Sequence, residues 1–331
     1  MSGLVGFARP VQPDASLLQE AAESLQELLQ LEDTPRWSVT ARDVRKRSTL
    51  FRLAATHQFG VTYAWAKVDA PTGSPLKPGQ FERILARVQD SLMFEQQVSP
   101  LLAVELGEHN VAFDRPLAIN VAQLSAVRLE VPGRELGHVL NRMLPGRRRA
   151  GAKTFSQVGS VVRCVETVSG SFGPSFDEEW LERHIEAELD RVRGKLTTAL
   201  HRRVSELAHE LAAGIDLNRS SVRGHGDLSP TNILVDSGRL GLIDFSWRRF
   251  LAGESVAYFV ARLSIEPRTP LSWKRAAVAA VLEGYRCDEV ASWRLAYLMR
   301  LLRWSAKSAP DRRDWARAEM SAFLAVDSGS R

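Results

Sequence analysis

The spacing of hydrophobic and polar residues divides the chain into a strand-rich first part and a helix-rich second part. Residues 14–32 carry leucine and alanine at helical spacing, which predicts an amphipathic helix with Asp14 as its N-cap. Turn signals near Arg45–Ser48 and near Phe59–Gly60 separate the segments that follow. Three of these segments are rich in β-branched and aromatic residues, and each predicts a strand: 37–49, 50–58 and 61–69.

A loop rich in proline and glycine comes next, and the pattern then predicts a helix at 81–98 and strands at 117–123 and 126–131. Val131-Pro132-Gly133 ends the last of these strands, and the pattern beyond it is mostly helical. The sequence therefore predicts three parts: an N-terminal helical extension at 1–36, a strand-rich domain at 37–131 and a helix-rich domain at 132–331.

The helical part contains a cap signal and a long amphipathic run. Ser175 followed by Glu178 is a capping-box pattern, so we expect a helix to begin there. Its hydrophobic residues continue at helical spacing to Leu211, which fits one long helix or two helices joined by a bend near Gly194. Residues 271–325 predict three further helices.

The composition is that of an ordinary globular protein. The 331 residues carry a net charge of +5, but the basic residues are not interleaved with aromatic ones in a single stripe, so no nucleic-acid partner is expected. No apolar run is long enough to predict a membrane span, and the N-terminus does not resemble a secretory signal. With only two cysteines, Cys164 and Cys287, we expect a cytoplasmic protein.

Residues 224–245, GHGDLSPTNILVDSGRLGLIDF, place polar groups beside two short strand-like runs. Asp227 and Asn232 are close enough in sequence for one loop to present both. The Asp-Ser-Gly turn at 236–238 would let the flanking runs pair as a hairpin and bring Asn232 and Asp244 to the same end. Carboxylate and amide oxygens can hold Mg²⁺, and a carboxylate on the loop can accept a proton from a hydroxyl.

The order H-x-D-L-x-x-x-N, a short hairpin and then Asp-Phe is the catalytic and metal-binding pattern of protein kinases. With Gly226 in its second position, the stretch closely resembles the aminoglycoside phosphotransferase and choline kinase-like family. This resemblance implies an α+β, bilobal protein-kinase-like fold, with an antiparallel sheet in the N-terminal lobe and a helical C-terminal lobe. It also implies Mg²⁺-dependent transfer of the γ-phosphoryl group of ATP, or of GTP, to a hydroxyl of a small molecule.

The resemblance also assigns residues on the catalytic side of the reaction. Asp227 matches the catalytic base, Asn232 a metal ligand and Asp244 the principal metal ligand. His225 is more readily interpreted as a packed structural residue than as a base.

On the nucleotide side, Lys67 in the third predicted strand matches the lysine that binds nucleotide phosphates as a point charge. The family's hinge often ends in Pro-Gly, which matches Pro132-Gly133. Backbone groups of Leu129 and Val131 are therefore expected to face the adenine, although Arg128 is an unusual residue just before a hinge.

The sequence departs from the family pattern at three places. The loop at 44–50 has no glycine; Ser48 and its neighbours could hold phosphates, and a solvated basic turn is equally consistent with the sequence. Ser255 stands where many family members have an Asp that braces the catalytic loop. The acid that pairs with Lys67 is not assigned by the sequence, and the candidates on the helix are Glu82, Asp90 and Glu95.

Charge gives a first indication of the acceptor. Between Ser246 and Arg331, 15 Lys and Arg residues stand against 9 Asp and Glu residues. This balance favours a neutral or anionic acceptor, such as a sugar, a lipid-linked sugar or a natural product, over a polycationic aminoglycoside antibiotic. The alternative function is a catalytically weak pseudokinase that acts as a nucleotide-binding or interaction module.

Overall fold

The structure is a computed structural model that describes most of the chain: residues 12–45, 48–69, 80–142, 148–170, 172, 177–264, 271–286, 290–306 and 310–328. The chain forms two compact units. Unit 1 comprises Met1–Glu108, Ala112–Pro132 and Gly241–Ile243, and unit 2 comprises His109–Val111, Gly133–Leu240 and Asp244–Arg331.

Unit 1 is built on a five-stranded antiparallel sheet in the order β1-β2-β3-β6-β5. Its strands are β1 (Trp37–Val44), β2 (Ser48–His57), β3 (Gly60–Asp69), β5 (Pro116–Asn120) and β6 (Ser125–Leu129). The five strands expected in this part of the sequence are therefore all present.

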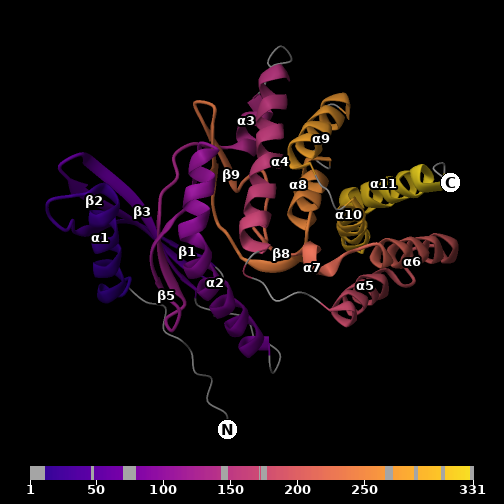
Figure 1. Ribbon diagram of the computed structural model, residues 1–331, viewed down its shortest axis with the longest axis horizontal. Coiled ribbons are helices and arrows are strands. Elements are labelled where there is room, and N and C mark those ends of the chain that lie inside the picture. The colour runs from indigo at the N-terminus through magenta and orange to yellow at the C-terminus, as the bar shows by residue number, and fades with distance from the viewer. Residues whose placement is uncertain are drawn as a thin grey trace, which may run out of the picture. The chain divides into compact units, whose positions relative to one another are not determined.

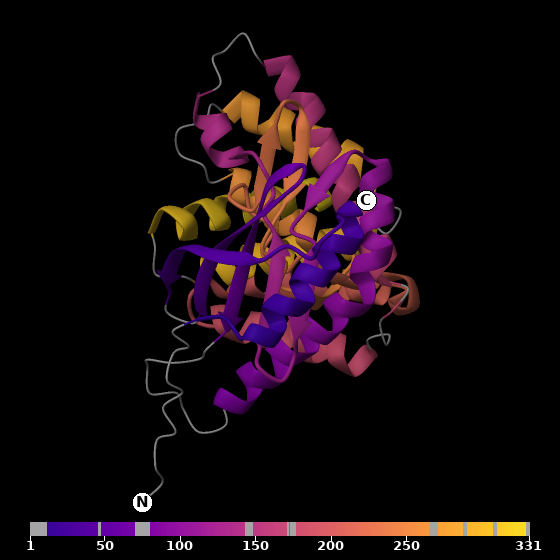
Figure 2. The same cartoon turned by 90° about the vertical axis from the view of Figure 1, so that its left-hand side faces the viewer.

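Helix α1 (Ala15–Leu29) packs against one face of this sheet (Figure 2). Asp14 caps the helix as predicted, because its carboxylate accepts hydrogen bonds from the backbone N–H groups of Ser16 and Leu17. The core between helix and sheet includes Leu17, Ala21, Leu25, Phe51, Leu53, Ala55, Ala64, Ala66 and Val127. Because side chains alternate along a strand, the residues between these positions, Lys67 among them, lie on the opposite face.

Helix α2 (Gln80–Glu108) is longer than the predicted helix at 81–98, and it continues through Pro100. Proline removes one backbone donor and usually ends a helix. Here the buried positions Val98, Leu102 and Leu106 lie on one face on both sides of the proline. Burial of this continuous face therefore outweighs the local cost of the proline.

Unit 2 is mainly helical (Figure 1), as the sequence predicts. Its helices are α3 (Leu136–Arg142), α4 (Arg148–Gly170), α5 (Glu178–Val192), α6 (Thr198–Ala213), α7 (Leu217–Ser220), α8 (Glu254–Ser264), α9 (Leu271–Tyr285), α10 (Val290–Ser305) and α11 (Pro310–Ser328). The amphipathic run before residue 211 thus forms two helices, with Gly194 at a positive φ of 72° between them. Asp177 caps α5 through the N–H of Trp180, and the predicted cap Ser175 lies outside the described residues.

The described residues also form six short strands: β4 (Val111–Phe113), β7 (Arg134–Glu135), β8 (Ser221–Gly224), β9 (Ile233–Asp236), β10 (Arg239–Leu242) and β11 (Arg248–Leu251). They form a four-stranded sheet in the order β4-β10-β9-β7 and the pair β11-β8. Together with the five-stranded sheet and the helices, they give the α+β, protein-kinase-like fold that the resemblance implies.

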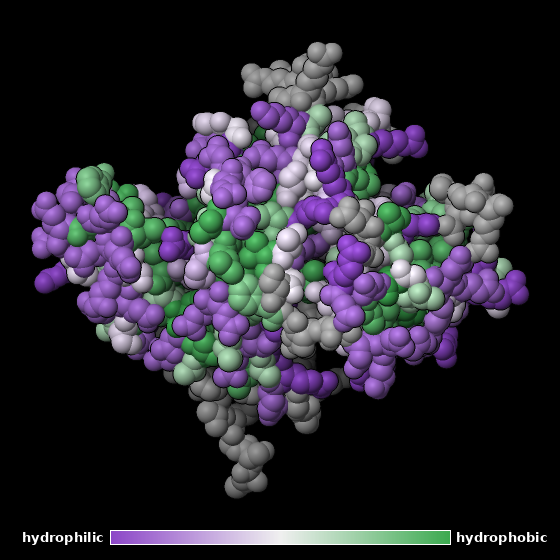
Figure 3. All heavy atoms as spheres, in the orientation of Figure 1, coloured by the Kyte–Doolittle hydropathy of each residue, from purple (hydrophilic) through white to green (hydrophobic). Residues whose placement is uncertain are grey.

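Hydrophilic residues cover much of the outer face of α5 and α6 in the view of Figure 3. None of the described helices combines the length and the hydrophobicity that crossing a bilayer requires.

Candidate active site

The segment predicted to be the catalytic loop begins where β8 ends, and its first residue is packed rather than exposed. The ring of His225 is 2% exposed and lies 4.4 Å from the ring of Phe245, which in turn stacks on Trp247 at 4.8 Å. The backbone carbonyl of His225 accepts a hydrogen bond from the N–H of Ser246 at 3.0 Å. His225 therefore joins the loop to the segment that follows Asp244, as expected for a structural residue.

Gly226 is required by the geometry of this junction. Its φ of +77° lies in the left-handed region, and a Cβ atom at this position would lie 2.0 Å from the carbonyl oxygen of Ser246. An arginine, which protein kinases have here, could not occupy this backbone conformation without moving the segment at 246.

The loop then turns back so that Asn232 reaches the backbone of Asp227. The side-chain Nδ2 of Asn232 donates to the carbonyl oxygen of Asp227 at 2.9 Å, and its backbone N–H donates to Ser229 at 2.9 Å. The carboxylate of Asp227 is exposed. The structure therefore brings Asp227 and Asn232 together, and the Oδ1 atom of Asn232 is not used by this hydrogen bond.

Asp244 follows a tight hairpin made of β9 and β10. Ser237 and Gly238 connect the strands with φ of +48° and +85°, the two positive values of a type I′ turn. Asn232 immediately precedes β9 and Asp244 lies just beyond β10, so both lie toward the open end of the hairpin. Asp244 is exposed and itself has a left-handed backbone, with φ of +59°, which Asp tolerates better than most residues.

These donors suit a hard divalent cation. The side chains of Asn232 and Asp244 offer only oxygen as ligand atoms, since the nitrogen of Asn232 is bound to the loop. Mg²⁺ prefers oxygen ligands and usually takes one or two carboxylates together with substrate phosphates. The residues present therefore fit the ion that the resemblance implies.

Tyr258 of α8 lies near the predicted base, a neighbour that the sequence gave no reason to expect. Burial raises the pKa of Tyr258; among the nearby charges, that of Arg262 lowers it and that of Asp227 raises it. The guanidinium groups of Arg300 and Arg262 lie 4.5 Å and 5.7 Å from the centre of the Tyr258 ring.

Support for the segment after Asp244 comes from α4. The buried carboxyl of Glu166 accepts hydrogen bonds from the N–H of Gly253 at 3.0 Å and from the hydroxyl of Tyr285. Ser255, which stands in place of the bracing Asp, is buried in the first turn of α8 beside this contact. The altered support expected from the sequence thus includes a carboxyl group from a different helix.

Unit 1 holds the residues predicted on the nucleotide side. Lys67 is half-buried on β3, opposite Leu50 of β2 and Ala126 of β6. It shares its sheet face with Arg128, because Arg128 pairs with Trp65 two residues before Lys67.

Arg128 pairs with Glu95, one of the three acids on helix α2 that the sequence offered as partners of Lys67. Its guanidinium donates to both carboxylate oxygens of Glu95, at 2.8 Å and 2.6 Å, and the two side chains are 11% and 3% exposed. Burial alone would lower the pKa of Arg128, but the Glu95 carboxylate outweighs it and the pKa is raised. Glu82 and Asp90 are exposed on the same helix.

The glycine-free turn is partly outside the described residues, which exclude Lys46 and Arg47. The backbone N–H of Arg45 donates to the carbonyl of Ser48 at 2.8 Å. Ser48 and Thr49 are both buried at the start of β2.

The predicted hinge follows β6. The N–H of Leu129 donates to the carbonyl of Arg115 at 2.9 Å, and the N–H of Glu130 donates to Tyr63 at 3.0 Å. Val131 is buried directly before Pro132, where unit 1 passes into unit 2 along the chain.

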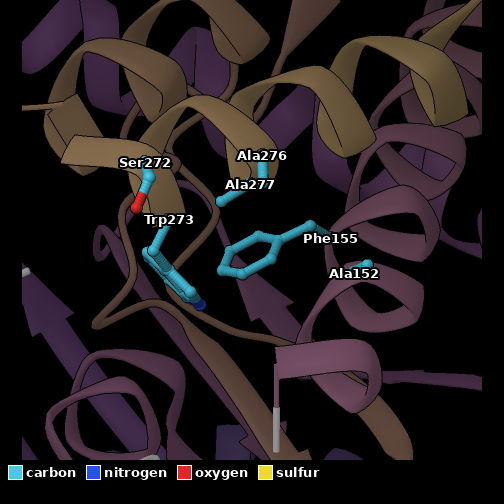
Figure 4. A pocket seen from close by; sticks show the side chains of 6 residues that line it. All are labelled: Ala152, Phe155, Ser272, Trp273, Ala276 and Ala277. Atoms are coloured by element: carbon cyan, nitrogen blue, oxygen red, sulfur yellow. The ribbon is translucent and has the colours of Figure 1, made fainter. Parts of the chain in front are cut away.

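Unit 2 also contains a small apolar cavity of about 140 Å³ between α4 and α9. Figure 4 shows Phe155 of α4 and Trp273 of α9 lining it, with ring centres 5.3 Å apart. Elsewhere in this unit, His209 of α6 lies 3.2 Å and 3.4 Å from the carboxylates of Glu182 and Glu186 of α5. A hydrogen bond to the Ser205 carbonyl and these two acids raise the pKa of His209.

Comparisons with solved structures support the fold. A glucosamine kinase superposes with a TM-score of 0.53 at 15% identity, covering 95% of this chain and 99% of that one. An APH(2″) phosphotransferase solved with GDP and kanamycin gives 0.52 at 16%, covering 89% and 95%. A protein assigned as a fructosamine-3-kinase from Thermobifida fusca YX-ER1 gives 0.50 at 18%, covering 92% and 98%.

Comparison of the sequence with known proteins identifies the family as well as the fold. No curated protein sequence matches the chain significantly. A family model described as the phosphotransferase enzyme family matches residues 80–246, slightly more than half of the chain, and this segment includes the loop, the hairpin and Asp244. The match confirms the family and the kind of enzyme predicted from the sequence, and we conclude that the chain belongs to the phosphotransferase enzyme family.

Proposed function

We propose that this phosphotransferase moves the γ-phosphoryl group of ATP, or of GTP, to a hydroxyl of a neutral or anionic small molecule, in a reaction that requires Mg²⁺. The hydrogen bond from Asn232 to the backbone of Asp227 carries the proposal, because it holds a base and a metal ligand in a single turn of the chain. In phosphoryl transfer most of the rate comes from positioning and charge neutralisation, so this arrangement matters more than strong basicity.

On the unit 2 side, one residue would act on the acceptor and two would bind the metal ion. Asp227 would orient the acceptor hydroxyl and take its proton as the new bond to phosphorus forms. Asn232 and Asp244 would hold the Mg²⁺ ion, which neutralises charge on the phosphates when bound.

Residues 37–131 would bind the nucleotide and residues 132–331 the acceptor. Lys67 would pair with the phosphates, and Ser48 would contribute from the start of β2. Since the N–H of Leu129 is engaged by Arg115, the adenine would meet the carbonyl of Leu129 and the N–H of Val131. A cytoplasmic location would supply the nucleoside triphosphate.

The groups next to Asp227 support the choice of acceptor. Two guanidinium groups, those of Arg262 and Arg300, lie over the Tyr258 ring, and the charge of Asp227 acts on the pKa of the same tyrosine. Glu254 pairs with Arg300 at 3.6 Å. A polycationic aminoglycoside would be repelled by the remaining positive charge, whereas hydroxyl, carboxylate or phosphate groups would be attracted.

The test is a transfer assay with labelled γ-phosphate of ATP and GTP against sugars, sugar acids, sugar phosphates and aminoglycosides. The wild-type protein should label an uncharged or acidic acceptor only with Mg²⁺ present. Asp227→Asn should lower kcat by roughly 10²–10⁴-fold while the nucleotide Kd stays unchanged, because the side chain keeps its size but loses its charge. A kcat within twofold of wild type would exclude Asp227 as the base.

Thermal melting combined with the transfer assay distinguishes the proposed function from the alternative, a pseudokinase. Nucleotide with Mg²⁺ should raise the melting temperature if the site binds it, since ligand binding to the folded state stabilises by mass action. Stabilisation by nucleotide without transfer to any member of the panel would favour a pseudokinase. Two structural features are consistent with that alternative: the glycine-free turn and the Arg128–Glu95 ion pair.

A further inference from the structure

Three side chains with metal-binding atoms meet between α5 and α6, and the proposed phosphoryl transfer uses none of them. Glu182 and Glu186 lie four residues apart on α5, so their side chains project from the same face of the helix. His209 comes from α6, which packs against α5 in unit 2 (Figure 1). The ligand atoms of all three side chains lie within 4.8 Å of one another. Two helices therefore present one imidazole and two carboxylates to a common point.

The imidazole of His209 is oriented with its Nε2 atom toward the two carboxylates. Its Nδ1 atom lies 2.7 Å from the backbone carbonyl oxygen of Ser205, one turn earlier on α6. Because a carbonyl oxygen only accepts hydrogen bonds, Nδ1 carries a hydrogen, and Nε2 is the ring atom that can bind a cation. Metal-binding histidines almost always make such a contact, which fixes the tautomer and the orientation of the ring. His209 is therefore held as a metal ligand needs to be.

The distances within the cluster suit metal coordination. The Nε2 atom of His209 lies 3.2 Å from Glu182 Oε1 and 3.4 Å from Glu186 Oε1. A tetrahedral Zn²⁺ ion, with bonds of roughly 2.0–2.2 Å, separates its ligand atoms by about 3.4 Å. A charge-assisted N–H···O hydrogen bond is shorter, about 2.7–2.9 Å, and one N–H group points directly at only one acceptor. An ion between the three side chains would thus satisfy both carboxylates at once.

The ligand atoms indicate the class of ion. Mg²⁺ and Ca²⁺ prefer sites made of oxygen alone, whereas imidazole together with carboxylate suits Zn²⁺ and its first-row neighbours. Solvent can deliver the ion, because the three side chains are 38%, 58% and 47% exposed for His209, Glu182 and Glu186. Two arginines of the same helices pair with other acids, Arg183 with Glu179 at 3.7 Å and Arg202 with Glu206 at 3.8 Å.

We propose that Glu182, Glu186 and His209 form a binding site for a Zn²⁺-class ion, which links α5 to α6 and stabilises unit 2. Three protein ligands leave the fourth tetrahedral position to water. The ion would fasten the two helices on the far side of the turn at Gly194. This site shares no residue with the proposed reaction, so each can fail without the other.

The test is calorimetric titration of the full chain, without an affinity tag, with ZnCl₂ in the presence of excess Mg²⁺, which occupies sites made of oxygen alone. The wild-type protein should bind one Zn²⁺ ion through this cluster, and Zn²⁺ should raise its melting temperature by mass action. His209→Ala and Glu186→Gln should each weaken Zn²⁺ binding roughly tenfold or more. Without metal, both variants should melt close to wild type, because exposed ion pairs contribute little to stability. Glu186→Gln keeps the size of the side chain, so it carries the test if His209→Ala does not fold.

His201→Gln is the matched control on α6. The Nε2 atom of His201 lies 3.4 Å from the carbonyl oxygen of Leu189, outside the cluster, and the variant should keep the wild-type affinity for Zn²⁺. Co²⁺ provides a second readout, since a tetrahedral site gives it strong visible absorption, which His209→Ala should abolish. No Zn²⁺ binding in excess Mg²⁺, equal affinity in wild type and His209→Ala, or the same loss in His201→Gln would each overturn the inference.

Discussion

Two left-handed residues determine the shape of the loop at 225–232 and of the segment that ends in Asp244. Gly226 has no room for a Cβ atom beside Ser246, and Asp244 adopts a positive φ that few residues tolerate. The sequence marked Gly226 as characteristic of the family. Its physical reason could not be predicted, because it lies in a contact between two segments that only the folded chain brings together.

The loop glycine and the hairpin glycine offer a matched pair of substitutions. Gly226→Ala combines left-handed strain with a Cβ atom 2.0 Å from the Ser246 carbonyl, whereas Gly238→Ala has φ of +85° and nothing within 4 Å. Strain alone costs roughly 1–2 kcal/mol. We therefore expect Gly238→Ala to keep transfer activity with a small loss of melting temperature.

Gly226→Ala should lose transfer activity, because the segment at Ser246 must move and Asp244 moves with it. Activity assays and melting curves on both variants check this prediction. Equal activity of the two variants would show that the 226–246 contact does not shape the site.

Ion pairs were the least predictable feature at this scale. The sequence offered three acids for Lys67, and the structure shows one of them, Glu95, bound through both oxygens to Arg128. Which residue of a 29-residue helix faces a given strand depends on how the helix sits on the sheet, and no local pattern contains that information.

Among the helices and strands, existence was predictable and boundaries were less so. The periodicity of α1 and its Asp14 cap were correct, since both signals are local. Helix α2 extends beyond its predicted end and continues through Pro100, because its buried face continues on both sides of the proline. Strands β7 and β11, of two and four residues, are too short to show a period and were not expected, whereas the equally short hairpin strands β9 and β10 were predicted from the turn between them.

The pairing of α4 with α9 depends on glycines that lower the helix propensity of their own segments. A Cβ atom on Gly159 would lie 2.0 Å from the carbonyl of Val281, and one on Gly284 would lie 1.8 Å from the carbonyl of Ser156. The two helices therefore approach backbone to backbone. Sequence periodicity predicts each helix, but glycine in a helix gives no sign of its partner.

This contact predicts opposite effects for the same substitution in two helices. Gly159→Ala should destabilise unit 2 by roughly 1–3 kcal/mol or more, since the added methyl group overpacks the interface. Gly107→Ala in α2 meets nothing within 4 Å and should be neutral or stabilising by up to about 1 kcal/mol. Urea denaturation of both variants measures the difference. A stable Gly159→Ala protein would contradict the close packing of α4 on α9.

For the whole molecule, the α+β kinase-like class followed from one dense motif and from the change of periodicity after residue 133. The strand order β1-β2-β3-β6-β5 could not be read from these signals. The sequence also could not predict that Gly241–Ile243 belongs to unit 1, because this assignment depends on contacts between residues far apart in the sequence.

Two buried glutamates contribute to stability in opposite ways. Glu188 of α5 is paired with Arg303, which donates from Nε at 3.0 Å and from Nη2 at 2.5 Å. Among the described residues no cation pairs with Glu166: burial raises its pKa to about 7, against the lowering effect of its hydrogen bonds from Tyr285 and Gly253. Charge on Glu166 therefore opposes folding, whereas charge on Glu188 is balanced.

The sign of the pH dependence follows from the raised pKa of Glu166. Between pH 4.5, its ordinary value, and about 7, the folded state holds a proton that the unfolded state has lost. Stability from this group is complete below pH 4.5, falls as pH rises through this window by on the order of 3 kcal/mol, and is constant above it. Glu166→Gln stays neutral and can still accept hydrogen bonds, so its unfolding free energy should lack this decline and should exceed that of wild type above pH 7.

Glu188→Gln is the control and should be less stable than wild type, because it leaves Arg303 with a weaker partner. Urea unfolding of the three proteins from pH 4.5 to 8 gives the curves, and the difference between wild type and Glu166→Gln isolates the titration from that of His209 and other groups. Parallel curves for wild type and Glu166→Gln would show that this carboxyl does not change its protonation on folding.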